Sequence, residues 1–221
     1  MRFASVIAER RFLILFVAIL LDWVVYPLLE SASMAKVLLG SFTLAILLSA
    51  LLSVISGPGL RGLALALGIP AIGTTVLGML WDVPGVILAD NVLVGSFLLF
   101  VTIVVLHTVL SAANVTWEVV NGALCVYLLF GFSFAAAYVV LETTHPDSFA
   151  TSMRPHDAPS LRRALLYFSF VTQTTMGYGD ITPATPLARS LATLQAIAGQ
   201  LYLTVLVARL VALQIVHQGR A

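Results

Sequence analysis

The sequence predicts an all-α integral membrane protein with six transmembrane helices and one shorter re-entrant helix. The first observation is composition: 60% of the 221 residues are hydrophobic and only 10% are charged, whereas charged residues make up about 25% of a soluble domain. Such a chain lacks the polar side chains to cover its own surface in water. The second observation is that its apolar runs reach about 20 residues, which suits membrane-spanning helices better than barrel strands.

Six apolar segments satisfy this length requirement, and turn-forming residues separate several of them. Gly57-Pro58-Gly59 follows the second segment, Asp82-Val83-Pro84 follows the third, and the stretch 111–114 follows the fourth. The spans are expected at Phe12–Leu29, Ala35–Ile55, Gly62–Trp81, Val86–Leu110, Val119–Leu141 and Leu187–Ile215.

Basic residues near the first spans predict the orientation. Arg2, Arg10 and Arg11 precede the first span, and Arg61 follows the second. By the positive-inside rule these ends are cytoplasmic, so both termini are expected inside and the loop between the last two spans outside. The first apolar run is longer than a signal-peptide core, so we expect a true span rather than a cleaved leader. The sequence thus indicates a multi-pass protein of the cell membrane, plasma or inner.

A shorter apolar segment, Leu161–Gln173, lies between the fifth and sixth spans and is too short to cross a bilayer. Asp157, Pro159 and Ser160 stand just before it and supply a capped helix start. We therefore expect a helix that enters the membrane and turns back, followed at once by the loop Thr174–Asp180.

The loop Thr174–Asp180 reads Thr-Thr-Met-Gly-Tyr-Gly-Asp and is the most informative part of the chain. Consecutive carbonyl groups can point the same way only if residues alternate between right- and left-handed conformations. Gly177 and Gly179 supply left-handed steps at little steric cost. Rings of such carbonyls from several chains can replace the water shell of a cation. The alternatives are a simple glycine-rich turn and a phosphate-binding loop, but no Gly-Lys-Ser/Thr follows.

This motif resembles the selectivity filter of pore-loop potassium channels, with Met176 in the variable position. Residues 118–221 are similar to the channel pore domain in order: outer helix, turret, pore helix, filter and inner helix. Residues 1–117 would form a four-helix peripheral bundle, as in a prokaryotic-type six-span member without a charged voltage-sensor helix. The resemblance implies a homotetramer, because one chain supplies one pore loop and four are needed to surround an ion.

The resemblance also implies a role for each residue of the loop. Thr175 would coordinate the innermost K⁺ through its hydroxyl and carbonyl, and the Tyr178 side chain would turn back into the scaffold. The implied K⁺-coordinating residues are Thr175, Met176, Gly177 and Tyr178. The implied supports of the filter and its outer mouth are Thr174, Gly179, Asp180 and Tyr167.

The aromatic support of the filter departs from the best-known pattern of the family. Where many relatives carry two tryptophans, this chain has Tyr167 and Phe168. Tyr167 can still donate a hydrogen bond to Asp180, but Phe168 cannot bind the hydroxyl of Tyr178. The restraint on the outer mouth is therefore expected to be looser.

Three residues of the last span are candidates for the cavity and gate. Gly199 stands where relatives bend to open a gate, although a glycine in a membrane helix can equally be a close-packing point. Gln200 and Thr204 lie one turn apart and are expected to face a water-filled cavity, because polar side chains avoid lipid. Gln195 points the opposite way and is expected to hydrogen-bond to a neighbouring helix.

The fourth span carries no voltage-sensing charges, because no Lys or Arg occurs between Gly62 and Met153. Each charge that crosses the field contributes about 2.3 kcal/mol per 100 mV, so a span without basic residues has little to sense with. Two acids, Asp22 and Asp90, lie at membrane depth and are functional candidates. For Asp90 we favour the simpler interpretation, an acid paired with a polar neighbour such as Asn91.

The sequence predicts a potassium-selective channel that conducts passively with little or no voltage gating. The alternative is a subunit of a potassium uptake transporter with a channel-like pore loop, although such proteins carry four loops in one chain. No His-Glu-x-x-His or Gly-x-Ser-x-Gly motif indicates an enzyme. We expect no cofactor besides permeant K⁺. The expected partners are the lipid bilayer and three further copies, without nucleic acid, and a separate regulatory subunit is left open.

Overall fold

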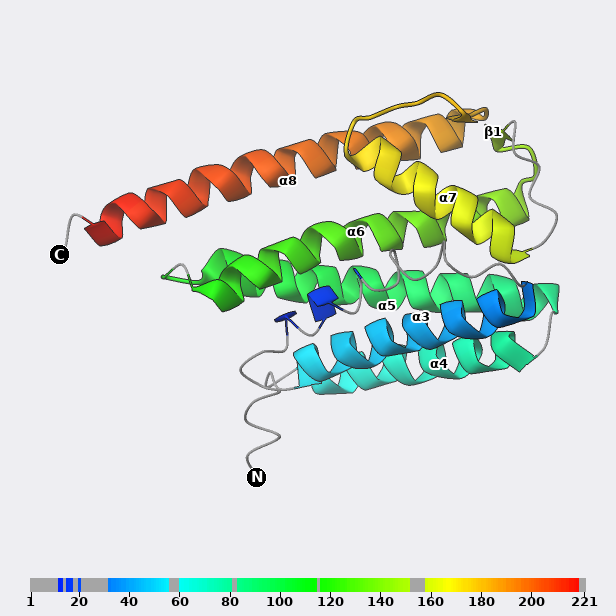
Figure 1. Cartoon of the computed structure of the whole chain (residues 1–221), viewed down its shortest axis with the longest axis horizontal. Coiled ribbons are helices and arrows are strands. Elements are labelled where there is room, and N and C mark those ends of the chain that lie inside the picture. The colour runs from blue at the N-terminus through cyan, green and yellow to red at the C-terminus, as the bar shows by residue number, and fades with distance from the viewer. Residues whose placement is uncertain are drawn as a thin grey trace.

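The computed structural model describes residues 32–55, 60–80, 83–114, 116–151 and 158–218, together with parts of the segment 12–20. Long helices that lie side by side dominate this part of the chain (Figure 1). In chain order the elements are α3 (Ala32–Ile55), α4 (Arg61–Leu80), α5 (Pro84–Ser111), α6 (Trp117–Thr144), β1 (Phe149–Thr151), α7 (Ala158–Gln173), β2 (Ile181–Pro183) and α8 (Pro186–Gln218).

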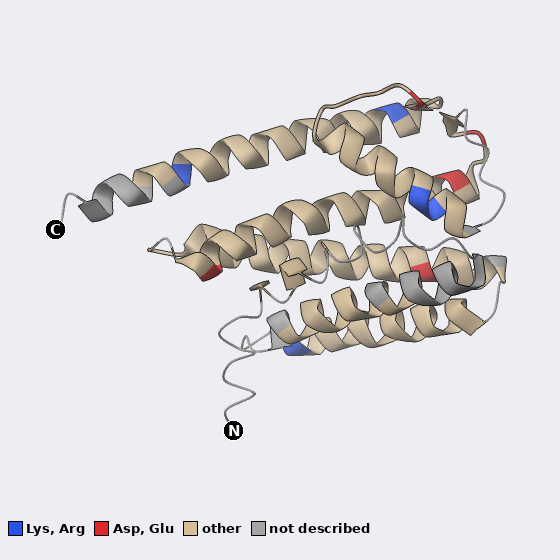
Figure 2. Cartoon of the chain, in the orientation of Figure 1, with Lys and Arg blue, Asp and Glu red and all other residues tan. Residues whose placement is uncertain are grey.

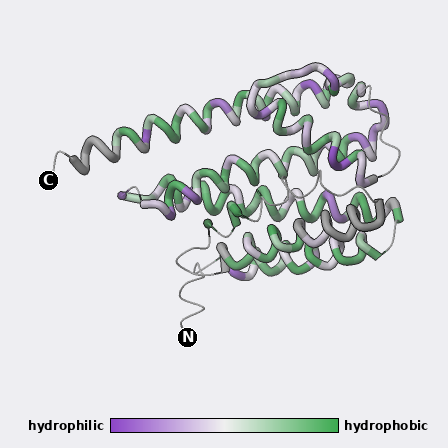
Figure 3. Tube along the Cα trace, viewed as in Figure 1, coloured by the Kyte–Doolittle hydropathy of each residue, from purple (hydrophilic) through white to green (hydrophobic). Residues whose placement is uncertain are grey.

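Four helical stretches in the described part are long and apolar enough to cross a membrane, and they match the third to sixth predicted spans. Figure 3 shows that hydrophobic residues predominate along these helices. Charged residues are few and lie mostly near helix ends and connections (Figure 2). The chain therefore has the make-up of a multi-pass membrane protein. The four stretches are Arg61–Leu80, Gly85–Ser111, Trp117–Thr144 and Pro186–Arg209.

The structure does not establish the first two predicted spans as membrane crossings. Helix α3 covers the second predicted span, but the apolar stretch found within it, Thr43–Leu52, is shorter than a membrane crossing. Most of the first predicted span, Phe12–Leu29, lies outside the described residues, as does Asp22. A total of six transmembrane helices therefore stays a prediction.

Helices α5 and α6 make the most extensive helix–helix contact in the described part of the chain. Only residues 112–116 connect them, so α5 packs against the helix that directly follows it. Thr116 is the N-cap of α6, because its side-chain hydroxyl accepts a hydrogen bond from the backbone N–H of Val119 at 3.3 Å. Helices α3 and α4 cover the other side of α5, and this packing buries Phe97 and Val101 completely.

Asp90 does not pair with Asn91, contrary to the sequence-based interpretation. Its carboxylate binds Arg162 of α7 at 2.7 Å and also accepts a hydrogen bond from Thr75 of α4 at 2.8 Å. Asn91 instead donates to the carbonyl of Ile87, one turn earlier in α5. The reason is geometric, because adjacent residues on a helix point in different directions and do not face each other.

Helix α7 packs against α6 on one side and α8 on the other, and it crosses obliquely between them in Figure 1. It begins at Ala158, three residues before the predicted apolar start at Leu161. Three mutually packed rings, Tyr138, Phe149 and Phe168, have centroids 5.2–5.3 Å apart and are buried. They join α6, β1 and α7 at the end of the bundle where β1 pairs antiparallel with β2.

This aromatic cluster predicts the effect of Phe149→Ala. Phe149 is only 7% exposed, and a buried Phe→Ala change typically costs about 3 kcal/mol or more, because it removes apolar contacts and leaves a cavity. We expect the free energy of unfolding in detergent to fall by about that amount. Thermal or SDS denaturation measures it, with Phe149→Leu as the milder control. Equal stability of Phe149→Ala and the parent protein would contradict the assigned packing.

Candidate functional site

The backbone of the 174–180 loop alternates in the way the sequence predicts. Gly177 has φ +56° and Gly179 has φ +79°, so both occupy the left-handed region. Thr175 also lies there, with φ +59°. The glycine pattern does not predict this third left-handed residue, because a β-branched residue rarely adopts a positive φ. Such a conformation costs about 1–3 kcal/mol and persists only where the surroundings hold it.

Hydrogen bonds anchor the start of the loop, and the residues along it are exposed to solvent in the single subunit. The backbone N–H of Met176 donates to the carbonyl of Val171 at 2.9 Å, and the Thr174 hydroxyl donates to the carbonyl of Phe170 at 2.7 Å. All residues from 174 to 179 are exposed in the single subunit. Within the described part of the chain, no hydrogen bond reaches the backbone carbonyls of residues 175–178. These carbonyl oxygens are therefore free to bind a cation.

The far end of the loop is tied to α7 through Tyr167. The rings of Tyr167 and Tyr178 stack with centroids 6.4 Å apart and planes only 5° apart. The hydroxyl of Tyr167 also interacts with the carboxylate of Asp180. Asp180 in turn accepts from the backbone N–H of Ile181 at 3.1 Å. The ring of Tyr178 packs against Tyr167 of α7, yet Tyr178 stays 66% exposed in the single subunit.

Behind the loop lies a fully buried polar network centred on two glutamines. Gln195 of α8 donates to the Ser169 hydroxyl at 2.7 Å and to the side-chain oxygen of Gln173 at 3.1 Å, and it accepts from Tyr138 at 2.6 Å. Gln173 also donates to the carbonyl of Tyr127 in α6 at 2.7 Å. The network thus joins α6, α7 and α8 directly beneath the loop. A satisfied network of this kind rigidifies its surroundings.

The prediction that Gln195 bonds to a neighbouring helix is confirmed, whereas sequence reasoning missed Gln173. The available signal was a long amide side chain at the end of an apolar segment, immediately before the loop. Such a side chain needs buried partners, because an unpaired buried amide is costly. Its partners come from segments 22 and 46 residues away, so the sequence alone could not identify them.

The residues predicted for the cavity and gate lie on α8 where it passes the end of α7. A Cβ added to Gly199 would stand 2.9 Å from Cγ and 3.2 Å from the carbonyl oxygen of Gln173, so this glycine is a close-packing point. Gln200 reaches the same carbonyl at 3.5 Å, and Thr204 donates to the carbonyl of Gln200. Both Gln200 and Thr204 are exposed. The bending of α8 at Gly199 stays a prediction.

The electrostatics of this region favour a cation. The dipole of α7 places partial negative charge at its C-terminal end, next to the loop. In the described residues the nearby loop carries one acid, Asp180, and no basic side chain. An array of carbonyl oxygens at a helix C-terminus can therefore hold a dehydrated monovalent cation, but it offers no nucleophile or general base.

A model of a family described as "Ion channel" matches residues 122–214. The matched segment runs from α6 to α8 and contains the whole candidate site. Less than half of the chain is matched, so the family assignment applies to this segment. The match points to a channel and not to an enzyme.

Two curated proteins are similar to part of the chain. The "Two pore potassium channel c" of Oryza sativa subsp. japonica is 42% identical over 67 residues, which are 28% of this chain and 14% of that protein. The "Inward rectifier potassium channel Kirbac3.1" of Paramagnetospirillum magnetotacticum is 36% identical over 83 residues, 36% of this chain and 24% of that protein. The chain thus spans a quarter or less of these relatives. No solved structure matches significantly.

The buried network predicts that two glutamines on the same helix respond differently to substitution. Gln195→Leu removes the acceptor of the buried Tyr138 hydroxyl and the donor to the side-chain oxygen of Gln173, and we expect a loss of about 2 kcal/mol in unfolding free energy. Gln200→Leu, the matched control at an exposed position, should change it by about 0.5 kcal/mol or less. Chemical denaturation of both variants in detergent measures the difference. Similar losses in the two variants would show that the network does not support the fold.

Proposed function

We propose that the protein is a potassium-selective channel that conducts K⁺ passively through a homotetrameric pore. The observation that carries this proposal is the alternation of left-handed residues at Thr175, Gly177 and Gly179 in an exposed loop at the C-terminal end of α7. This alternation aligns the intervening carbonyls on one side, which is the arrangement that replaces the hydration shell of an ion. The ion-channel match over residues 122–214 and the two potassium-channel relatives support it.

Ion coordination follows from this arrangement. The hydroxyl and carbonyl of Thr175 would form the innermost site, and the carbonyls of Met176, Gly177 and Tyr178 would form the outer sites. Gln200 and Thr204 would line the aqueous cavity below. Tyr167, through its contacts with Tyr178 and Asp180, would support the outer mouth.

Tetramer formation would bury an apolar face of α8 that one subunit leaves exposed. One chain supplies one loop, and four loops are needed to enclose an ion. The face consists of five side chains that are each more than half exposed and recur at helical spacing. They are Leu187, Leu194, Ile197, Leu201 and Val205.

In the membrane the 174–180 loop would open to the exterior, with both termini in the cytoplasm, as the basic residues at the start of the chain predict. The end of the bundle that carries β1 and β2 is then the outer end. Helix α5 would hold the place of a voltage-sensing helix, but it contains only one acid, Asp90, and no Lys or Arg.

Gly177→Ala is expected to abolish K⁺ flux while leaving assembly intact. Within one subunit a Cβ at Gly177 meets nothing within 4 Å. The penalty is therefore conformational, about 1–2 kcal/mol for each subunit that must keep a left-handed alanine. Potassium flux into liposomes measures the effect, and size-exclusion chromatography checks assembly.

The matched control is Gly73→Ala. Gly73 lies inside α4, where a Cβ also meets nothing within 4 Å and no positive φ is required. It should conduct like the parent protein. Flux of parental size through Gly177→Ala would refute the ion-coordinating role of the loop.

The open probability is expected to depend only weakly on voltage. Steep dependence needs several charges that move through the field, at about 2.3 kcal/mol per charge per 100 mV. Asp90 is fixed to α4 and α7 by three hydrogen bonds, so it cannot travel across the membrane. A conductance–voltage curve in symmetrical potassium measures this. A sigmoid as steep as several elementary charges would show that the first four helices sense voltage after all.

A further inference from the structure

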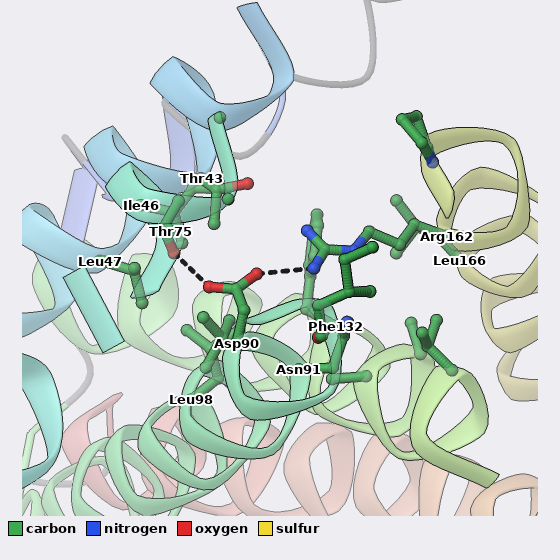
Figure 4. Close-up of a pocket in the computed structure, with 18 of the residues that line it drawn as sticks. Thr43, Ile46, Leu47, Thr75, Asp90, Asn91, Leu98, Phe132, Arg162 and Leu166 are labelled. Carbon is green, nitrogen blue, oxygen red and sulfur yellow. Dashed lines mark hydrogen bonds and ion pairs between the residues drawn. The ribbon is translucent and has the colours of Figure 1, made fainter. Parts of the chain in front are cut away.

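Asp90 is the buried centre of a three-helix junction in the outer half of the bundle. The residue is 3% exposed, and its carboxylate accepts hydrogen bonds from Thr74 and Thr75 of α4 and from Arg162 of α7. Figure 4 shows Asp90 between Thr75 and Arg162. The ion pair between Asp90 and Arg162, 2.7 Å long, is a direct charged link between the peripheral helices and the pore helix.

Arg162 lies near the start of α7, and α7 ends at the 174–180 loop. A helix moves as a stiff rod over this length, so a displacement at Arg162 reaches the residues that carry the carbonyls. A cavity of about 170 Å³ adjoins the pair and is lined by Thr43 of α3, Phe132 of α6 and Leu166 of α7 among others.

The opposite end of α5 is tied to the inner helix. Arg209 of α8 donates from both terminal nitrogens, to the carbonyl of Val109 at 2.9 Å and to that of Ala112 at 2.8 Å. These carbonyls belong to the last turn and cap of α5, where the helix leaves its acceptors unsatisfied and carries partial negative charge. An arginine in that place is favourable on both counts. The cytoplasmic half of α8 therefore holds α5 directly.

Helix α5 runs unbroken between these two attachments. It extends from Pro84 to Ser111 without an internal proline. Asp90 and Val109 are 19 residues apart, which corresponds to about 28 Å along the axis. One rigid helix thus connects the cytoplasmic half of the inner helix to the outer start of the pore helix.

We propose that α5 transmits the position of the inner helix to the pore helix, with Asp90, Arg162 and Arg209 as positioning residues. A shift of α8 at Arg209 moves α5, and the Asp90–Arg162 pair passes that movement to α7 and the 174–180 loop. The opening of the inner mouth and the conductance of the loop are then coupled through a helix outside the pore. This inference rests on the proposed channel function.

A more direct route also exists, because Gln195 of α8 bonds to Gln173 of α7. The experiment must separate the two routes. Substitutions more than about 10 Å apart that share no partner usually act independently. A departure from independence between Asp90 and Arg209 therefore reports the α5 route, since neither residue touches the Gln173–Gln195 network.

The experiment is a double-mutant cycle on the full-length channel in planar bilayers, read out as open probability. Its members are the parent, Asp90→Asn, Arg209→Gln and the double variant. We expect each single change to shift the ratio of open to closed times about tenfold, a typical allosteric coupling. The double variant should show about the same shift as either single variant. Each substitution alone already breaks the connection through α5, so the second substitution has nothing further to break. Asp90→Glu, which keeps the charge, should retain most of the parental behaviour.

Two matched controls remove the same charges elsewhere. Asp147→Asn changes an exposed acid near the outer end, and Arg61→Gln changes an exposed base at the start of α4. Both should leave the open probability unchanged, alone and combined with the test variants. If Asp90→Asn fails to assemble, Arg162→Gln takes its place in the cycle, because it removes the same ion pair from the α7 side and keeps the hydrogen bonds from Thr74 and Thr75 to Asp90.

Three results would decide against the proposal or its premise. A double variant whose effect equals the product of the single effects would show that α5 does not connect the two sites. Single variants that assemble and gate like the parent would show the same. A parent protein that passes no K⁺ in the same bilayers would overturn the channel function itself, so the two failures are distinguishable.

Discussion

The hydrogen bond between Gln173 and Gln195 is the interaction on which the rest of the site depends. The 174–180 loop holds three residues in the left-handed region, one of them a threonine, and it exposes its carbonyls instead of pairing them. Such a backbone keeps its shape only if the structure behind it is rigid. The two glutamines provide this, because they are completely buried and join α6, α7 and α8 at the point where the loop begins. Gly199 allows the close approach that these bonds require.

The loop is held at three places, and each limits a different motion. The glutamine network fixes its start, the contact of Tyr167 with Tyr178 and Asp180 fixes its outer end, and the Asp90–Arg162 pair fixes the far end of the helix that carries it. The first two restraints lie within the segment that matches the ion-channel family. The third comes from the peripheral helix α5, which contains no Lys or Arg. Its role in this account is mechanical, since it positions the pore helix from outside.

Much of the fold was predictable from local signals in the sequence. Long apolar runs located the helices from α4 to α8, and alternate glycines located the left-handed steps at residues 177 and 179. The positive φ of Thr175, the partner of Asp90 and the importance of Gln173 were not predictable. Each depends on residues that approach one another only in the folded chain, such as Asp90 and Arg162, which are 72 positions apart. The pairing of Asp90 with Asn91 failed because sequence proximity does not place neighbouring helical side chains face to face.

The central claim is that the 174–180 loop selects K⁺ by replacing its water shell with carbonyl oxygens. The most direct measurement is the reversal potential of single channels of the purified protein in a planar bilayer, with potassium on one side and sodium on the other. The account predicts unitary currents that reverse close to the potassium equilibrium potential. Unitary currents that reverse near zero would show a pore without this selectivity. Potassium uptake without any unitary current would indicate a transporter instead, and either result would contradict the account.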